Sequence, residues 1–185
     1  MSAQRTRERI LDAAVERIAS DGIDAVRIAR IAMDARVSTA LVHYHFATRE
    51  ALLAEALEHS FETAGAVREQ PGDPATRLRA MVEQCLPRPG EQERDWVLWV
   101  ELWLRAVRHP ELRPTAAKLY ERMHEWFREA IEEEFPSADA GAIADRTLAL
   151  IDGFGVRALL GDPAMPLERA REEIWAGLAP VPAPH

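Results

Sequence analysis

The stretch that decides the fold runs from Gly22 to Glu50 and reads GIDAVRIARIAMDARVSTALVHYHFATRE. Its first half places small or branched apolar residues at the spacing of one helix face, namely Ile28, Ile31, Ala32 and Ala35. Ala32 sits at the centre of this face and is small enough to let a second helix approach closely. The spacing therefore predicts a helix of about two turns that packs against a neighbour.

A second short helix is predicted directly after the turn at Arg36 and Val37. Ser38 is a residue type that commonly caps a helix N-terminus, so this helix is expected to begin at Thr39. Its inward residues are Val42 and Phe46, and its outward residues are Thr39, Ala40, His43 and Tyr44. Two short helices with a tight turn and such an outward face are typical of a helix-turn-helix that enters the major groove. The geometry alone is not specific, because structural helix pairs share it.

Helical spacing recurs along the rest of the chain, and no stretch shows sustained period-two alternation. Gly22 is expected to end the first helix in a left-handed conformation, and Asp73 is expected to cap a helix whose first residue is Pro74. We predict an all-α fold of nine helices. Besides the two above, these are expected at about 6–20, 48–70, from 74 to before Pro87, 95–108, a helix ending near Phe135, 139–160 and 166–179.

Charge is distributed unevenly along the 185 residues, whose net charge is −8. Residues 1–50 carry a net charge of +1, whereas residues 51–185 carry −9. This asymmetry is expected if only the N-terminal part meets phosphate, although an acidic soluble protein could show it without any such role.

Cys85 is the one cysteine, which excludes an internal disulfide, and we expect it to be a buried apolar residue. No signal peptide and no apolar run of about 20 residues is seen, so a cytoplasmic location is expected.

The segment from Gly22 to Leu53 resembles the DNA-binding region of the TetR family of regulators. Residues 96–103, 108–112 and 150–153 are similar to the C-terminal domain of the BetI-type subgroup. The resemblance implies a helix-turn-helix domain at 1–47, with the motif at about 27–46, and a ligand-binding and dimerisation domain at 48–185. It also implies a homodimeric repressor that a small-molecule effector releases from a roughly palindromic operator. No cofactor is implied.

By position, the resemblance assigns a DNA surface to residues of the two short helices and their flanks. These are Arg27, Arg30, Ser38, Thr39, Ala40, His43, Tyr44, His45 and Arg49, with His45 and Arg49 on phosphate. Two residues depart from the family pattern. Arg36 replaces the usual glycine and is expected to be held left-handed at a cost of about 1 kcal/mol. Arg27 replaces the usual Ser or Thr cap, and the usual aromatic position holds His43, so either His43 or Tyr44 could touch the bases.

Two further surfaces are predicted in the C-terminal part. Apolar residues of its last two helices are expected to form an isologous dimer contact, namely Leu148, Ile151, Leu159, Leu167 and Ile174. A ligand site is expected at Trp96, Trp99, Trp103, Trp126, Phe127 and Asp152. The tryptophans could instead be core alone, and Asp152 could serve helix packing rather than a polar ligand.

Other function classes find little support in the sequence. His43 and His45 diverge by about 200° on a helix, so they cannot chelate one metal ion from the same face. The chain contains no HExxH motif, no glycine-rich phosphate loop and no nucleophile motif, so no catalytic residue is predicted. A helical enzyme and a helical ligand-binding protein without DNA activity remain as alternatives. The operator, the effector and the choice between repressor and activator cannot be read from the sequence.

Overall fold

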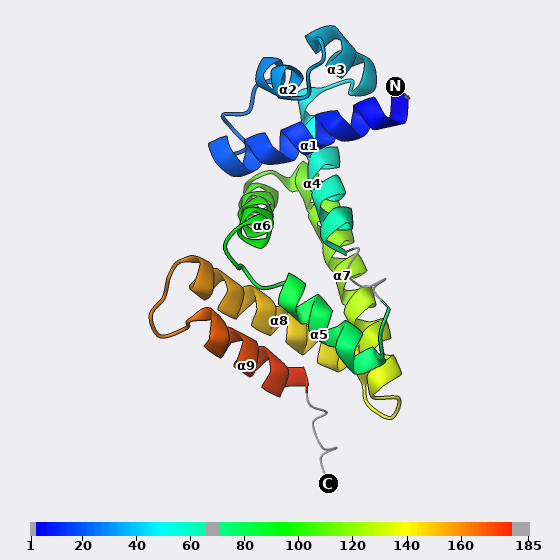
Figure 1. The fold of residues 1–185 in the computed structure, drawn as a ribbon, viewed down its shortest axis with the longest axis vertical. Coiled ribbons are helices and arrows are strands. Elements are labelled where there is room, and N and C mark those ends of the chain that lie inside the picture. The colour runs from blue at the N-terminus through cyan, green and yellow to red at the C-terminus, as the bar shows by residue number, and fades with distance from the viewer. Residues whose placement is uncertain (1–2, 66–70, 179–185) are drawn as a thin grey trace. The chain divides into compact units, whose positions relative to one another are not determined.

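The computed structural model describes residues 3–65 and 71–178, and every regular element within them is a helix (Figure 1). The all-α prediction is therefore confirmed. The elements are α1 (Ala3–Asp21), α2 (Ile28–Asp34), α3 (Thr39–His45), α4 (Arg49–Gly65), α5 (Pro74–Gln84), α6 (Glu91–Arg108), η2 (Pro110–Leu112), α7 (Arg113–Glu134), α8 (Ala140–Leu159) and α9 (Leu167–Leu178). The 3₁₀ turn η2 was not expected, and α6 begins four residues before the predicted start. Residues 66–70, the predicted end of α4, lie outside the described ranges.

The chain forms two compact units rather than two successive segments. Unit 1 contains residues 1–63 and 97–116, and unit 2 contains residues 64–96 and 117–185. The sequence placed a single boundary after Ala47. The difference arises because α4 packs its apolar face within unit 1, and because Trp99 of α6 lies edge-on to Phe61 of α4 with ring centroids 5.4 Å apart. Helical periodicity could not reveal that a later helix joins the N-terminal unit.

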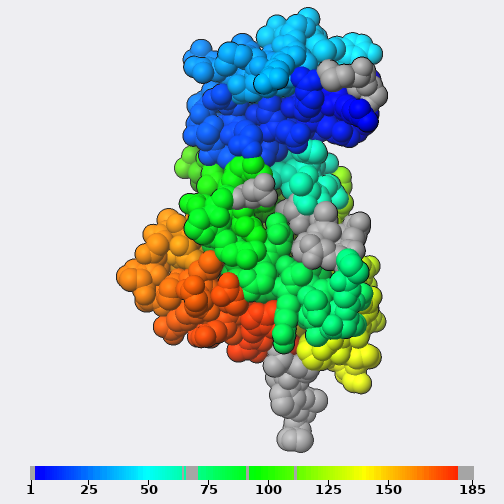
Figure 2. Space-filling model, viewed as in Figure 1, coloured from blue at the N-terminus to red at the C-terminus, as the bar shows by residue number. Residues whose placement is uncertain are grey.

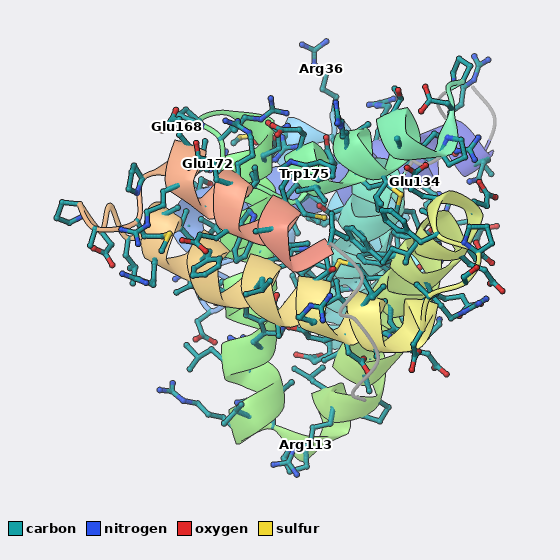
Figure 3. All side chains as sticks on the ribbon, turned by 90° about the horizontal axis from the view of Figure 1, so that it is seen from below. Arg36, Arg113, Glu134, Glu168, Glu172 and Trp175 are labelled. Atoms are coloured by element: carbon teal, nitrogen blue, oxygen red, sulfur yellow. The ribbon has the colours of Figure 1, made fainter. Side chains whose placement is uncertain are left out.

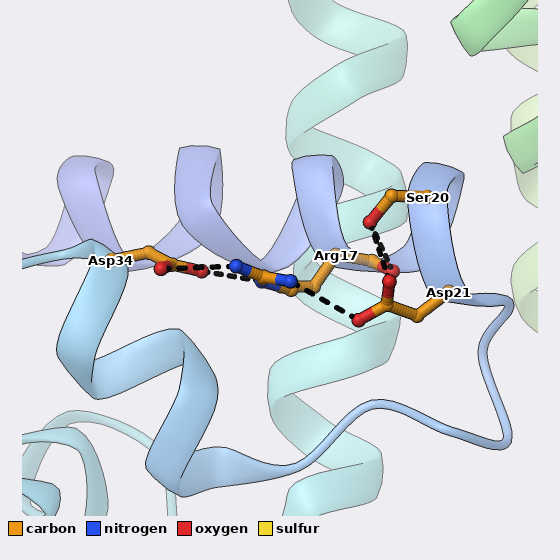
Figure 4. A network of polar contacts seen from close by, with 4 residues as sticks. All are labelled: Arg17, Ser20, Asp21 and Asp34. Carbon is orange, nitrogen blue, oxygen red and sulfur yellow. Dashed lines mark hydrogen bonds and ion pairs between the residues drawn. The ribbon is translucent and has the colours of Figure 1, made fainter.

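In unit 1, α2 and α3 lie across one side of α1 (Figures 1 and 2). Their contact is apolar: Ile10, Ile18, Ile31 and Val42 have no exposed surface. Polar contacts fix α2 on α1 as well (Figure 4). The Arg17 guanidinium donates hydrogen bonds to both carboxylate oxygens of Asp34, at 2.5 and 3.2 Å, and to Asp21 at 3.3 Å. The hydrogen bonds from Arg17, and to a lesser extent its charge, hold the pKa of the Asp34 carboxyl below its usual range.

In unit 2, α8 and α9 form an antiparallel pair, and α5 also contacts α9. Gly177 permits close packing, because a Cβ there would overlap Leu150 of α8. Arg146 donates to the Gly177 carbonyl at 2.7 Å, and Arg171 of α9 bonds both carboxylate oxygens of Glu83, at 2.5 and 3.1 Å. These bonds tie α9 to α8 and to the end of α5.

The helix ends follow the chemistry expected from the sequence. Asp73 accepts a hydrogen bond from the Thr76 amide at 3.0 Å, with Pro74 in the first turn of α5. Gly22 has a φ of +74°, which confirms the left-handed end of α1. No helix in the described part of the chain is long and apolar enough to cross a membrane.

Candidate functional site

The outward face of α3 is positioned by its N-terminal cap and its buried face. The Ser38 hydroxyl accepts a hydrogen bond from the Leu41 amide at 3.1 Å, as predicted, while Val42 and Phe46 are buried beneath the helix. This arrangement leaves the side chains of one surface exposed to solvent: Thr39, Ala40, His43 and Tyr44. Tyr44 is 79% exposed, a large value for an aromatic side chain. His45 is half-buried, with its ring edge-on to Tyr44 at a centroid distance of 5.2 Å.

The turn before α3 is a Schellman motif that usually requires glycine. The Val37 amide donates to the Ala32 carbonyl at 2.9 Å, and the Arg36 amide donates to the Met33 carbonyl at 3.1 Å. This pair of bonds places Arg36 in the left-handed position, where its φ is +53°. The sequence prediction of a left-handed Arg36 is thus confirmed. The expected strain is about 1–2 kcal/mol relative to glycine.

Arg27 and Arg30 flank the start of α2. Arg27 has the extended N-cap conformation and makes no capping bond with its side chain, in line with the loss of the usual Ser or Thr. Both arginines are exposed, and Arg30 is near enough to Asp34 to favour its ionised form. The two arginine side chains that were predicted to belong to the DNA surface at this end of α2 are therefore accessible to solvent.

Arg49 occupies a position that the sequence did not anticipate. Its guanidinium donates to the carbonyls of Ile23 at 2.5 Å, Val26 at 3.1 Å and Asp24 at 3.4 Å. Asp24 also forms an ion pair with Arg105 of α6. The α1–α2 loop is thus held by two arginines from two other helices. The first role of Arg49 in this structure is to satisfy loop carbonyls, and its predicted phosphate contact remains a prediction.

The six residues predicted to bind a ligand are divided between the two units. Trp99 and Trp103 belong to unit 1, and their rings lie at a tilt of 39° with a centroid distance of 5.9 Å. The other four, Trp96, Trp126, Phe127 and Asp152, belong to unit 2. Phe127 is 1% exposed and is part of the core, whereas Trp126 is partly exposed and lies against Gly65 with the Arg122 guanidinium 5.7 Å from its ring.

A polar cluster within unit 2 brings together Trp96, Asp152 and two residues that sequence reasoning had not assigned to a site. The Tyr120 hydroxyl donates to the Asp152 carboxylate at 2.5 Å, and the Trp96 indole donates to the Cys85 carbonyl at 3.0 Å. Trp96 packs against α8 where Gly155 leaves room, because a Cβ there would overlap its ring. Tyr120 lies two turns before Phe127 on the same face of α7. This spacing could have identified Tyr120 as a candidate site residue from the sequence.

The charge of Asp152 is poorly compensated. Burial raises the pKa of the Asp152 carboxyl, and the Tyr120 hydrogen bond only partly opposes this shift. Burial and the nearby Asp152 charge raise the pKa of the Cys85 thiol to about 12. The thiol is therefore not reactive, which agrees with the expectation that Cys85 serves packing. Cys85 is nevertheless partly accessible rather than fully buried. No basic side chain of the described residues lies within ion-pair distance of Asp152. A half-buried carboxylate without a cation is unusual in a helical core.

Two family models match this chain over the helices just described. The N-terminal model of bacterial regulatory proteins of the tetR family matches residues 10–56, and the C-terminal model of BetI-type transcriptional repressors matches residues 74–179. The chain belongs to the TetR family. It is a DNA-binding transcriptional regulator, and members of this family are regulators rather than enzymes.

Relatives of known name or structure support this membership. The transcriptional regulator BetI of Burkholderia mallei is 28% identical over 163 residues, which cover 85% of this chain and 84% of that protein. A transcriptional regulator from Saccharomonospora viridis, crystallised with choline, is 30% identical, with a TM-score of 0.79 and coverage of 94% and 95% of the two chains. A TetR-family regulator from Rhodococcus sp. has a TM-score of 0.83 at 28% identity, covering 96% and 97%.

The predicted dimer residues of this TetR-family chain differ in how much surface they expose. Leu148, Ile151 and Ile174 are 6%, 2% and 0% exposed within a single chain, so they offer little surface to a partner. Their assignment to a dimer surface stays a prediction. Leu159 and Leu167 are partly exposed and remain candidates.

Proposed function

We propose that this protein is a dimeric repressor that binds a roughly palindromic operator and leaves it when a small organic cation binds unit 2. The observation that carries the DNA part is the capped α3 helix, whose outward face exposes Thr39, Ala40, His43 and Tyr44 on a buried α2–α3 pair. A recognition helix of this kind reads base edges, while arginines beside it contact phosphates. DNA of bacteria lies in the cytoplasm, which is where the protein would act.

The test of this function is a binding titration with the DNA that precedes the protein's own gene. The complex should form at nanomolar to sub-micromolar protein and weaken steeply as salt rises, and choline should reduce it. Absence of any salt-sensitive complex would favour the ligand-binding alternative without DNA activity.

The dimer surface we propose is the outward face of α8 together with neighbouring residues of α9. Ala142, Ala149, Gly153 and Leu160 are exposed and recur at intervals that place them on one face of the helix. Leu160 is 78% exposed although it is apolar. The outward side of α9 adds Glu168 and Glu172 (Figure 3). Small side chains along α8 would let two copies of the helix cross closely about a two-fold axis.

Ala149→Glu is expected to convert the dimer into a monomer. It places two like charges near the two-fold axis, where they would be desolvated without a partner. Light scattering at micromolar concentration should report about half the wild-type mass. Ala117→Glu, at an exposed position of α7 in the same unit, makes the same change away from this face and should leave the dimer intact. A dimeric Ala149→Glu protein would place the interface elsewhere.

The effector class follows from the carboxylate in unit 2. The regulator from Saccharomonospora viridis was crystallised with choline, a quaternary ammonium ion. In the present chain, Asp152 offers a half-buried negative charge beside Tyr120 and Trp96, and aromatic faces with an anion suit such a cation. Binding acts as a switch only if the cation binds the DNA-free conformation better.

Asp152→Asn is expected to weaken choline binding by about 1.5–3 kcal/mol, or roughly tenfold to 150-fold, because it removes the opposing charge. Since the cation needs the ionised carboxyl, wild-type affinity should fall as pH drops through the raised pKa of Asp152, and Asp152→Asn should lose this dependence. Tryptophan fluorescence titrations at a series of pH values from neutral downwards would measure both. Asp145→Asn, which removes an exposed carboxylate from the same helix α8, serves as the matched control; an unchanged affinity of Asp152→Asn would contradict the assignment.

A further inference from the structure

We infer that Arg36, at the turn between α2 and α3, is an additional phosphate contact of the DNA-binding surface. This inference rests on the proposed DNA-binding face but adds a residue that the family pattern does not supply, because that pattern has glycine here. Three independent features of the position carry it: the strained backbone, the unpaired charge and the place of the turn between the two helices.

The backbone at Arg36 is strained for no local benefit. Both hydrogen bonds of the Schellman turn are made by main-chain atoms, so glycine at this position would form them equally well. The Arg9 guanidinium also reaches the turn, but it bonds the Ala35 carbonyl rather than the side chain of Arg36. Residues held at positive φ persist where the surroundings or the function require them, and they concentrate at functional sites. The side chain of Arg36 is therefore the feature to be explained.

That side chain has no partner within the described residues. It forms no hydrogen bond or ion pair with them, and it is exposed (Figure 3). The nearest acid in sequence, Asp34, is already bound by Arg17 through both carboxylate oxygens (Figure 4). The Arg36 charge is thus available to an outside anion. This differs from Arg17 and Arg49, whose guanidinium groups are engaged by their own chain.

The place of the turn indicates which anion this is. In a helix-turn-helix the first helix crosses the DNA backbone while the second lies in the major groove. Arg36 follows the end of α2 and precedes the Ser38 cap of α3 by two residues, so it lies where the chain passes from the backbone to the groove. A planar guanidinium on this rim fits a phosphate oxygen pair well.

Two substitutions separate a DNA contact from a purely structural residue. Arg36→Gln keeps the strained backbone and removes the charge, whereas Arg36→Gly removes both. If Arg36 contacts phosphate, both variants should bind a random-sequence duplex of about 30 base pairs less tightly. The slope of log affinity against log salt concentration should also fall by about one, the value expected for one lost phosphate contact. Arg36→Gly should do so while keeping or raising the melting temperature, by up to about 2–4 °C.

The control is Arg108→Gln, which removes the same charge from an exposed arginine of α6 in the same unit. In unit 1, α6 lies on the side of α1 opposite to α2 and α3 (Figure 1), so this variant should keep the wild-type slope. Fluorescence anisotropy of the labelled duplex between about 50 and 200 mM salt measures all four proteins. A wild-type slope for Arg36→Gln would overturn the inference. Failure of the wild-type protein itself to bind the duplex would instead overturn the proposed DNA-binding face.

Discussion

The double variant His43→Ala, Tyr44→Ala is expected to lose specific operator binding almost entirely. The two side chains lie on the exposed face of α3 and make no contribution to the buried face, which is formed by Val42 and Phe46. A well-made contact to a base edge contributes about 1–3 kcal/mol of discrimination, so the pair should cost about 2–6 kcal/mol, or roughly 30-fold to 10⁴-fold in affinity. The melting temperature should change little, because both residues are exposed.

The measurement is anisotropy on operator and random duplexes in parallel. Specific affinity should fall to the level of the random duplex, whose own affinity should be retained because arginines supply it. The two single variants would then show which of the neighbours touches the bases, a choice that the sequence left open. Val107→Ala, which trims a 72% exposed residue of α6, is the control for a surface change in the same unit. Normal operator binding by the double variant would show that α3 does not read the DNA.

Phe127→Ala is expected to destabilise the protein by about 3–5 kcal/mol. Phe127 is among the largest fully buried side chains, and its removal leaves a cavity in the core of unit 2. Urea unfolding should show the loss as a lower midpoint. The adjacent Trp126 is a matched control, since it is partly exposed and its truncation to alanine should cost clearly less. Equal losses for the two variants would contradict the division between core and surface on α7.

Truncation of Phe127 also tests the predicted ligand site. If Phe127 is core alone, a variant stabilised enough to fold should respond to choline as the wild type does, whereas Asp152→Asn should not. The sequence proposed Phe127 as a ligand residue because aromatics converging between helices commonly border pockets. Helical spacing cannot distinguish an aromatic residue that lines a pocket from one in the core behind it, because both kinds of residue recur at the same apolar positions.

The sequence by itself determined the elements and their ends. Helical spacing predicted the all-α fold, and local chemistry predicted the Ser38 and Asp73 caps, the left-handed Gly22 and the left-handed Arg36. Each of these features depends on residues within one or two turns of one another, so the chain carries the information locally. The outward face of α3 could also be predicted locally, because it is the side of the helix opposite its apolar residues.

The tertiary structure alone decided which partner each face meets. An apolar stripe on α8 or α9 predicts burial, but it does not say whether the cover is the same chain or a second copy, and Leu148, Ile151 and Ile174 proved to be buried within one chain. The contacts of Arg49 with Ile23 and of Tyr120 with Asp152 join residues 26 and 32 positions apart. Such pairs depend on how helices are placed in space, which a periodicity of 3.6 residues does not encode.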